Sequence, residues 1–154
     1  MRKISLILVL FLFSCKLMNR EGTSEENPLP IAGTWKLLTG TTIAKGDTTT
    51  IQYTRGQSFI KIINKTHFAF MDHDLSKGKD SASAIYVSGG GPYTLHDSTY
   101  TEHLEYCSDR QWEGHDFSFT ISIHQDTLVQ KGVEKAQDIG VNRINLETYV
   151  RLKN

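Results

Sequence analysis

Apolar and polar side chains alternate with a period of two along most of this chain. In residues 117–123, for example, every second side chain is a phenylalanine or an isoleucine, and serine and threonine stand between them. Such alternation is typical of an antiparallel strand with one buried face. Only residues 132–139 offer a short helical alternative, so the sequence predicts an all-β protein. The other predicted strands are residues 33–39, 49–54, 58–63, 66–72, 82–88, 92–96, 99–107, 127–133 and 145–152.

Short turn signals between these segments predict an antiparallel up-and-down meander. Examples are Arg55-Gly56 and Gln125-Asp126. A meander of eight to ten strands removes its exposed edges by closing into a barrel. Such a barrel is wide enough to hold a small ligand. A two-sheet sandwich is the structural alternative.

The first residues differ from the rest of the chain. Two basic residues precede ten almost wholly apolar residues, 4–13, which is the layout of a secretory signal and is too short for a membrane span. The segment Leu12-Phe13-Ser14-Cys15 resembles a bacterial lipobox. That resemblance implies that residues 1–14 are removed and that Cys15 carries the lipid, whereas an ordinary signal peptide with a chance cysteine is the alternative. We therefore expect an exported, membrane-anchored lipoprotein of the cell envelope.

Composition sets the remaining limits on domain organisation and partners. The 154 residues carry 17 basic and 17 acidic side chains and are 38% hydrophobic, which fits one ordered domain and argues against a nucleic-acid partner. Residues 15–30 are polar and predict a flexible tether, followed by one barrel domain over residues 31–154. Cys107 then has no internal disulfide partner and is interpreted as a small packed thiol. We expect a monomer.

Gly33-Thr34-Trp35, at the start of the first predicted strand, resembles the G-x-W signature of lipocalins and related calycin barrels. In those families a basic side chain near the end of the last strand lies over the tryptophan. The resemblance implies that Trp35 and Arg151 meet and close the barrel base. Residues 61–68, 89–95 and 99–106 also resemble uncharacterised lipocalin-like lipoproteins of Bacteroidetes-type bacteria, which implies the barrel fold and no fixed ligand.

The strand at residues 99–107 raises the sharpest local question. Its more apolar face carries Tyr100, Glu102, Leu104 and Tyr106, which places the Glu102 carboxylate inside the barrel. A buried carboxylate needs a cation, hydrogen bonds or a proton. Three arginines are candidate partners, and the carboxylate is either a polar anchor for a ligand or half of a structural ion pair. These arginines are Arg55, Arg143 and Arg151.

Catalytic and metal sites find little support in the sequence. The six histidines lack the close spacing of a metal site, and no positioned nucleophile such as a G-x-S-x-G turn is present. We expect a non-enzymatic protein without a metal or cofactor.

The leading hypothesis is a lipocalin-like lipoprotein that binds a small hydrophobic or amphipathic molecule in its lumen. The alternative is a structural or interaction lipoprotein whose barrel is filled by its own side chains. The ligand-binding candidates are Phe68, Phe70, Tyr100, Glu102, Leu104, Tyr106, Phe117, Phe119 and Ile121.

Overall fold

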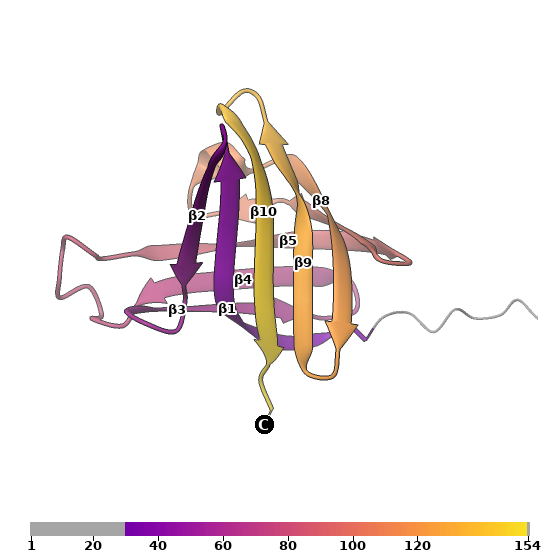
Figure 1. Cartoon of the computed structure of the whole chain (residues 1–154), viewed down its shortest axis with the longest axis horizontal. Helices are drawn as coiled ribbons and strands as arrows, with labels where there is room; N and C mark the ends of the chain where they lie inside the picture. Colours follow the sequence, from indigo (N-terminus) through magenta and orange to yellow (C-terminus); the bar gives the residue numbers. More distant parts are fainter. Residues whose placement is uncertain (1–29, 154) are drawn as a thin grey trace, which may run out of the picture.

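The computed structural model describes residues 30–153, which form an all-β domain (Figure 1). The predicted leader, Cys15 and the tether up to residue 29 lie outside the described residues. No helix in the described part is long and apolar enough to cross a membrane. The elements are β1 (Gly33–Ala44), β2 (Asp47–Gln52), β3 (Gln57–Ile63), β4 (His67–Asp74), β5 (Tyr86–His96), β6 (Thr99–Leu104), β7 (Tyr106–Cys107), the 3₁₀ helix η1 (Arg110–Trp112), β8 (His115–His124), β9 (Thr127–Ala136) and β10 (Val141–Arg151).

The strands form a closed antiparallel barrel. Eight of them pair in the order β1-β3-β4-β5-β6-β8-β9-β10, and β10 pairs with β1 from Trp35↔Arg151 to Ile43↔Ile144 to close the circle. The remaining two are side pairings, of β2 with β1 and of β7 with β5. In Figure 1 the strands β3, β4 and β5 cross β1, β8, β9 and β10 at a steep angle. The predicted all-β barrel is confirmed.

Some predicted boundaries are wrong. Residues 82–85 form a loop, and one long strand, β5, replaces the two strands expected at 82–88 and 92–96. Residues 132–136 continue β9, so the helical alternative at 132–139 is also wrong. Pairing of β9 with both β8 and β10 supplies backbone hydrogen bonds that local propensity does not anticipate.

Glycines allow β5 to continue through a crowded part of the barrel. A Cβ atom at Gly91 would lie 2.0 Å from the His103 carbonyl oxygen, and one at Gly90 would lie 2.5 Å from that of Phe68. Along this stretch β5 changes its neighbour from β6 to β7. A side chain would hold these backbones apart, so glycine is required here for packing.

The base of the barrel is closed by a packed aromatic and cationic group. Trp35 is fully buried, and the guanidinium carbon of Arg151 lies 4.0 Å from the centroid of its ring. The contact implied by the calycin resemblance is therefore present. Arg151 also donates hydrogen bonds of 2.6 Å to the carbonyl oxygens of Pro30 and Ala32, while Trp35 Nε1 donates to that of Ile31. These bonds tie the start of the described chain to the last strand.

Candidate functional site: a polar and aromatic lumen cavity

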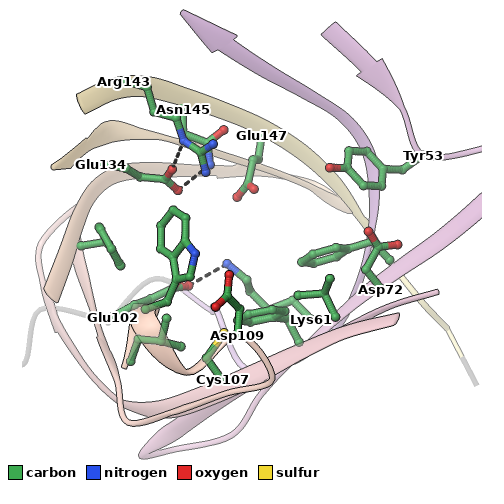
Figure 2. Close-up of a pocket in the computed structure, with 16 residues that line it drawn as sticks. Tyr53, Lys61, Asp72, Glu102, Cys107, Asp109, Glu134, Arg143, Asn145 and Glu147 are labelled. Atoms are coloured by element: carbon green, nitrogen blue, oxygen red, sulfur yellow. Dashed lines mark hydrogen bonds and ion pairs between the residues drawn. The ribbon is translucent and has the colours of Figure 1, made fainter. Parts of the chain in front are cut away.

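A cavity of about 360 Å³ lies inside the barrel (Figure 2). Aromatic side chains, carboxylates and two cations line it together. Its volume falls in the range of about 300–1,000 Å³ that is usual for small-molecule sites. Below it, Phe68, Tyr100, Phe119 and Ile121 are buried in the packed core and are not part of its lining.

The floor of the cavity is an ion pair that joins two strands, β3 and β6, that are not neighbours in the barrel. Lys61 Nζ on β3 lies 2.6 Å from Glu102 Oε1 on β6 and donates a second hydrogen bond, of 3.2 Å, to Gln130 Oε1 on β9. Lys61 is 2% exposed and Glu102 is 8% exposed. The Lys61 ammonium also lies 5.3 Å from the centroid of the Tyr149 ring, in a cation–π contact. The partner of Glu102 is therefore a lysine 41 residues away, and none of the three predicted arginines.

The polar face of β10 points into the barrel. Arg143 Nε and Asn145 Nδ2 donate hydrogen bonds of 2.5 and 2.9 Å to the two carboxylate oxygens of Glu134 on β9. Further along the strand, the Tyr149 hydroxyl donates to Glu147 Oε2 at 2.7 Å. These residues supply polar groups to one wall of the cavity, on which Figure 2 shows Glu134, Arg143, Asn145 and Glu147.

Aromatic rings from other segments of the barrel complete the lining of the cavity. Phe59 stacks on Phe70, with ring centroids 5.7 Å apart, and meets the edge of Tyr53 at 5.8 Å. Trp112, on η1, packs on Phe117 at 5.9 Å. These rings give the cavity a large apolar surface, which is the usual main source of affinity for small organic ligands.

Charges inside the barrel shift the acidity of several lining groups. Burial opposes charge on Lys61, but the carboxylates of Glu102 and Glu147 outweigh it and hold the pKa of Lys61 above its usual value. Burial raises the pKa of Glu102, an effect that the Lys61 charge opposes. Lys61 is thus a charged partner for Glu102, and the pair is a fixed dipole beneath the cavity.

Two further groups show that the side of the cavity near β4 is desolvated. Burial raises the pKa of the Asp72 carboxyl. Burial, followed by the charges of Asp72 and Glu147, raises the pKa of Tyr53 to about 12. Both pKa values are raised because the ionised form is less stable here, so a further negative charge is also unfavourable at this side of the cavity.

The structure separates the predicted ligand-binding residues into three groups. Four of them line the cavity, and four belong to the packed core described above. The ninth, Tyr106, is 66% exposed on the outside of the barrel, so its expected inward position is wrong. The lining residues of the predicted set are Phe70, Glu102, Leu104 and Phe117.

A β-bulge at Glu105 reverses the facing of Tyr106. The register of β5 against this segment shifts by one residue between Tyr93↔Glu102 and Gly90↔Tyr106. A one-residue shift moves the following side chains to the other face of the sheet, so Cys107 points inward and Tyr106 outward. Cys107 therefore lines the cavity as a buried thiol, and burial raises its pKa.

Sequence reasoning missed most of the polar lining. Lys61 lies between Ile60 and Ile62, so both faces of its strand are apolar enough to be the buried one. Asp72 ends the predicted strand 66–72 and was not expected to line a site, although it continues the inward face of β4 that begins with Phe68. That continued alternation was the available signal.

The described part of the chain also shows whether the histidines belong to a metal site. Among residues 30–153, no group of three or more His, Cys, Asp or Glu side chains could hold a metal ion. His115 lies beside the mouth, with Nδ1 3.1 Å from the Trp112 carbonyl oxygen and Nε2 2.8 Å from Asp138 Oδ1.

Comparisons with protein-family models and with curated proteins find no match to this chain.

Proposed function

We propose that the barrel binds a small hydrophobic or amphipathic molecule in its lumen and serves as a non-enzymatic binding protein of the cell envelope. The observation that carries this proposal is the cavity of about 360 Å³ above the packed core. A barrel filled by its own side chains, the structural alternative, would not contain such a cavity.

The nature of the lining supports binding as the role of the cavity. Aromatic rings provide apolar area, whose burial is worth about 25 cal/mol per Å². The main polar groups are held in place by one another, as the pairs Lys61–Glu102 and Arg143–Glu134 show. Fixed polar groups on a rigid barrel orient a bound molecule at little entropic cost.

A cavity-filling variant tests the proposal against a matched control. Val87 lines the cavity on β5, whereas Val133 on β9 is 54% exposed outside the barrel. The neutral apolar probe N-phenyl-1-naphthylamine is titrated with a protein of residues 30–154, which contain every strand of the barrel, and its fluorescence is measured. We expect saturable enhancement with the unchanged protein and with Val133→Trp, and its loss in Val87→Trp.

Circular dichroism and thermal unfolding establish that both tryptophan variants keep the barrel. Absence of saturable enhancement in the unchanged protein would refute lumen binding. Equal binding by Val87→Trp and Val133→Trp would place the probe elsewhere on the molecule and would also contradict the proposal.

The envelope location is part of the proposal and rests on the predicted lipobox. Cells that produce the full chain are supplied with radiolabelled palmitate. We expect label on the protein and its loss in Cys15→Ser, and an unlabelled protein would contradict a lipid anchor.

A further inference from the structure

The charges that line the cavity are unequal. Lys61 and Arg143 are its two cations, and each is paired with a carboxylate, Glu102 and Glu134 respectively. Three more carboxylates line the same cavity without a cationic partner among the described residues, namely Asp72, Asp109 and Glu147. Asp109 is exposed and accepts a hydrogen bond from Gln111, so the excess inside the barrel is concentrated on Asp72 and Glu147.

Asp72 is the more unusual of these two carboxylates. It is 6% exposed, and its Oδ1 atom is buried without a hydrogen-bond partner in the described structure. A buried carboxylate oxygen without a partner destabilises the folded state, because it loses water and gains nothing in return. Asp72 lies on the inward face of β4 and lines the cavity, so a rotation of its carboxylate group about χ2 presents this oxygen to a bound molecule.

Aromatic rings surround this acidic side of the cavity. Asp72 is directly opposite Phe59 in the β3–β4 pair, and Phe59 meets Tyr53 edge to face. Tyr53 in turn packs over Gly40, where an added Cβ would lie 3.1 Å from its ring, and Gly40 is opposite Glu147 in the β1–β10 pair. Figure 2 shows Tyr53 and Asp72 on one side of the cavity, with Glu147 on the adjoining wall.

The raised pKa of Tyr53 agrees with an excess of negative charge on this side of the cavity. The charges of Asp72 and Glu147 raise its pKa, after burial, and the opposing charge of Arg143 is the smaller effect. The local field is therefore negative although a cation lines the same cavity. A ligand carboxylate or phosphate placed here would be repelled.

We propose that the cavity binds an organic cation, an ammonium compound with an apolar or aromatic body, with Asp72 accepting the ammonium N–H and Glu147 as the second negative charge. This inference rests on the proposed lumen binding and names its ligand class. Aromatic faces attract ammonium groups, and a carboxylate strengthens that attraction in a desolvated site. A metal ion fits less well, because no metal-holding group of side chains is present in residues 30–153.

The hydrogen-bonding state of Asp72 also defines the kind of cation. Its Oδ1 needs a donor, which a primary or secondary ammonium supplies and a quaternary ammonium lacks. We therefore expect 4-phenylbutylamine to bind more tightly than trimethyl(4-phenylbutyl)ammonium. The neutral 4-phenylbutan-1-ol and the anionic 4-phenylbutanoic acid complete a series with the same apolar body.

Binding is measured on the full chain in a nonionic detergent through tryptophan fluorescence. The chain has two tryptophans, of which Trp112 lines the cavity and Trp35 is buried at the base. A ligand in the cavity changes the emission of Trp112, and Trp112→Phe removes the signal and so assigns it. Variants are compared at one detergent concentration, which cancels partition of the probes into micelles.

The amine is expected to bind more tightly than the alcohol, and the acid least tightly. Asp72→Asn should weaken amine binding about tenfold or more, as expected for a lost hydrogen bond to a charged group, and leave alcohol binding unchanged. Glu147→Gln should weaken it less. Asp47→Asn, at an exposed residue of β2 outside the cavity, removes the same charge and should have no effect.

Several results would overturn the inference. Equal affinity for amine, alcohol and acid, or amine binding that Asp72→Asn leaves intact, would refute a cation site while lumen binding stands. Calcium chloride that displaces the amine and changes the Trp112 emission by itself would identify a metal site instead. Failure of all four probes, together with failure of the neutral naphthylamine probe, would refute lumen binding as well.

Discussion

Replacement of Lys61 by methionine tests the energetic role of the pair beneath the cavity. Methionine keeps much of the apolar stem and leaves Glu102, which is 8% exposed, without its cation. Removal of one member of a buried ion pair costs about 3–5 kcal/mol. The variant also loses the hydrogen bond to Gln130 and the cation–π contact with Tyr149. We therefore expect Lys61→Met to lower the free energy of unfolding by about 3–5 kcal/mol, against a typical total of about 5–15.

The pH dependence of the stability loss in Lys61→Met identifies the cause of that loss. Without Lys61, burial is the largest influence on Glu102 and, with the charge of Glu147, raises its pKa in the folded state above that in the unfolded state. A carboxyl shifted in this direction stabilises the folded state below its unfolded pKa, and this stabilisation is lost as the pH rises. The deficit of Lys61→Met should therefore be smaller at about pH 5 than at about pH 8.

Urea unfolding followed by the emission of the buried Trp35 measures these changes. Addition of Glu102→Gln to Lys61→Met should restore about 2 kcal/mol, because the buried charge is then removed. Lys131→Met, at an exposed lysine of β9, is the matched control and should change stability by less than about 0.5 kcal/mol. A loss below about 1 kcal/mol, a loss independent of pH, or no rescue by Glu102→Gln would refute the reasoning.

Three further outcomes follow from single contacts. Asp72→Asn should raise the free energy of unfolding at neutral pH by about 1 kcal/mol, because it removes a buried charge without a partner, and the gain should vanish where Asp72 is protonated in both states. Arg151→Ala should lower thermal stability by about 1–3 kcal/mol through loss of the Trp35 contact and two backbone hydrogen bonds, and Arg151→Lys should recover only part of it. The pKa of His115 is raised because its ring donates hydrogen bonds to the Asp138 carboxylate and then to the Trp112 carbonyl oxygen, so its stabilising contribution is present below the unfolded histidine pKa and is lost as the pH rises through the folded value.

Each of these outcomes has a direct check. Thermal unfolding at neutral and acidic pH tests Asp72→Asn, and a loss of stability at neutral pH would contradict the buried-charge argument. Chemical unfolding tests the Arg151 variants, among which full recovery by lysine would exclude a special role for the planar guanidinium. Hydrogen exchange in residues 137–140 across the histidine range tests His115, and the same pH response in His115→Gln would contradict its assignment.

Local sequence pattern was sufficient for much of the fold. The strict alternation in residues 117–123 predicted β8 and its inward face, because phenylalanine and isoleucine on one side leave no choice of which face is buried. The inward position of Glu102 followed in the same way, from its apolar neighbours on β6. Where one face is clearly more apolar, burial free energy alone decides the orientation.

The candidate site was less accessible to this reasoning. On β10, hydrophobicity favours a buried face with Leu146 and Val150, yet the barrel buries Asn145 and Tyr149. The polar face of β10 is stable inside the barrel because Glu134 on β9 is hydrogen-bonded to Asn145 and Lys61 on β3 makes a cation–π contact with Tyr149. No pattern within β10 contains that information, since one partner lies on the preceding strand of the hairpin and the other, Lys61, on a strand distant in sequence.

The sequence by itself therefore determined the strand class and the meander, because alternation with turn residues is a local property, and it favoured a closed barrel over a sandwich. Only the tertiary structure decided that Glu102 pairs with Lys61, that Tyr106 points outward, and that Asp72 and Glu147 face one cavity. A buried polar group is stable only beside its partner, and a one-residue bulge reverses a strand's facing. Both depend on pairing between segments far apart in the chain, which is settled when the barrel closes.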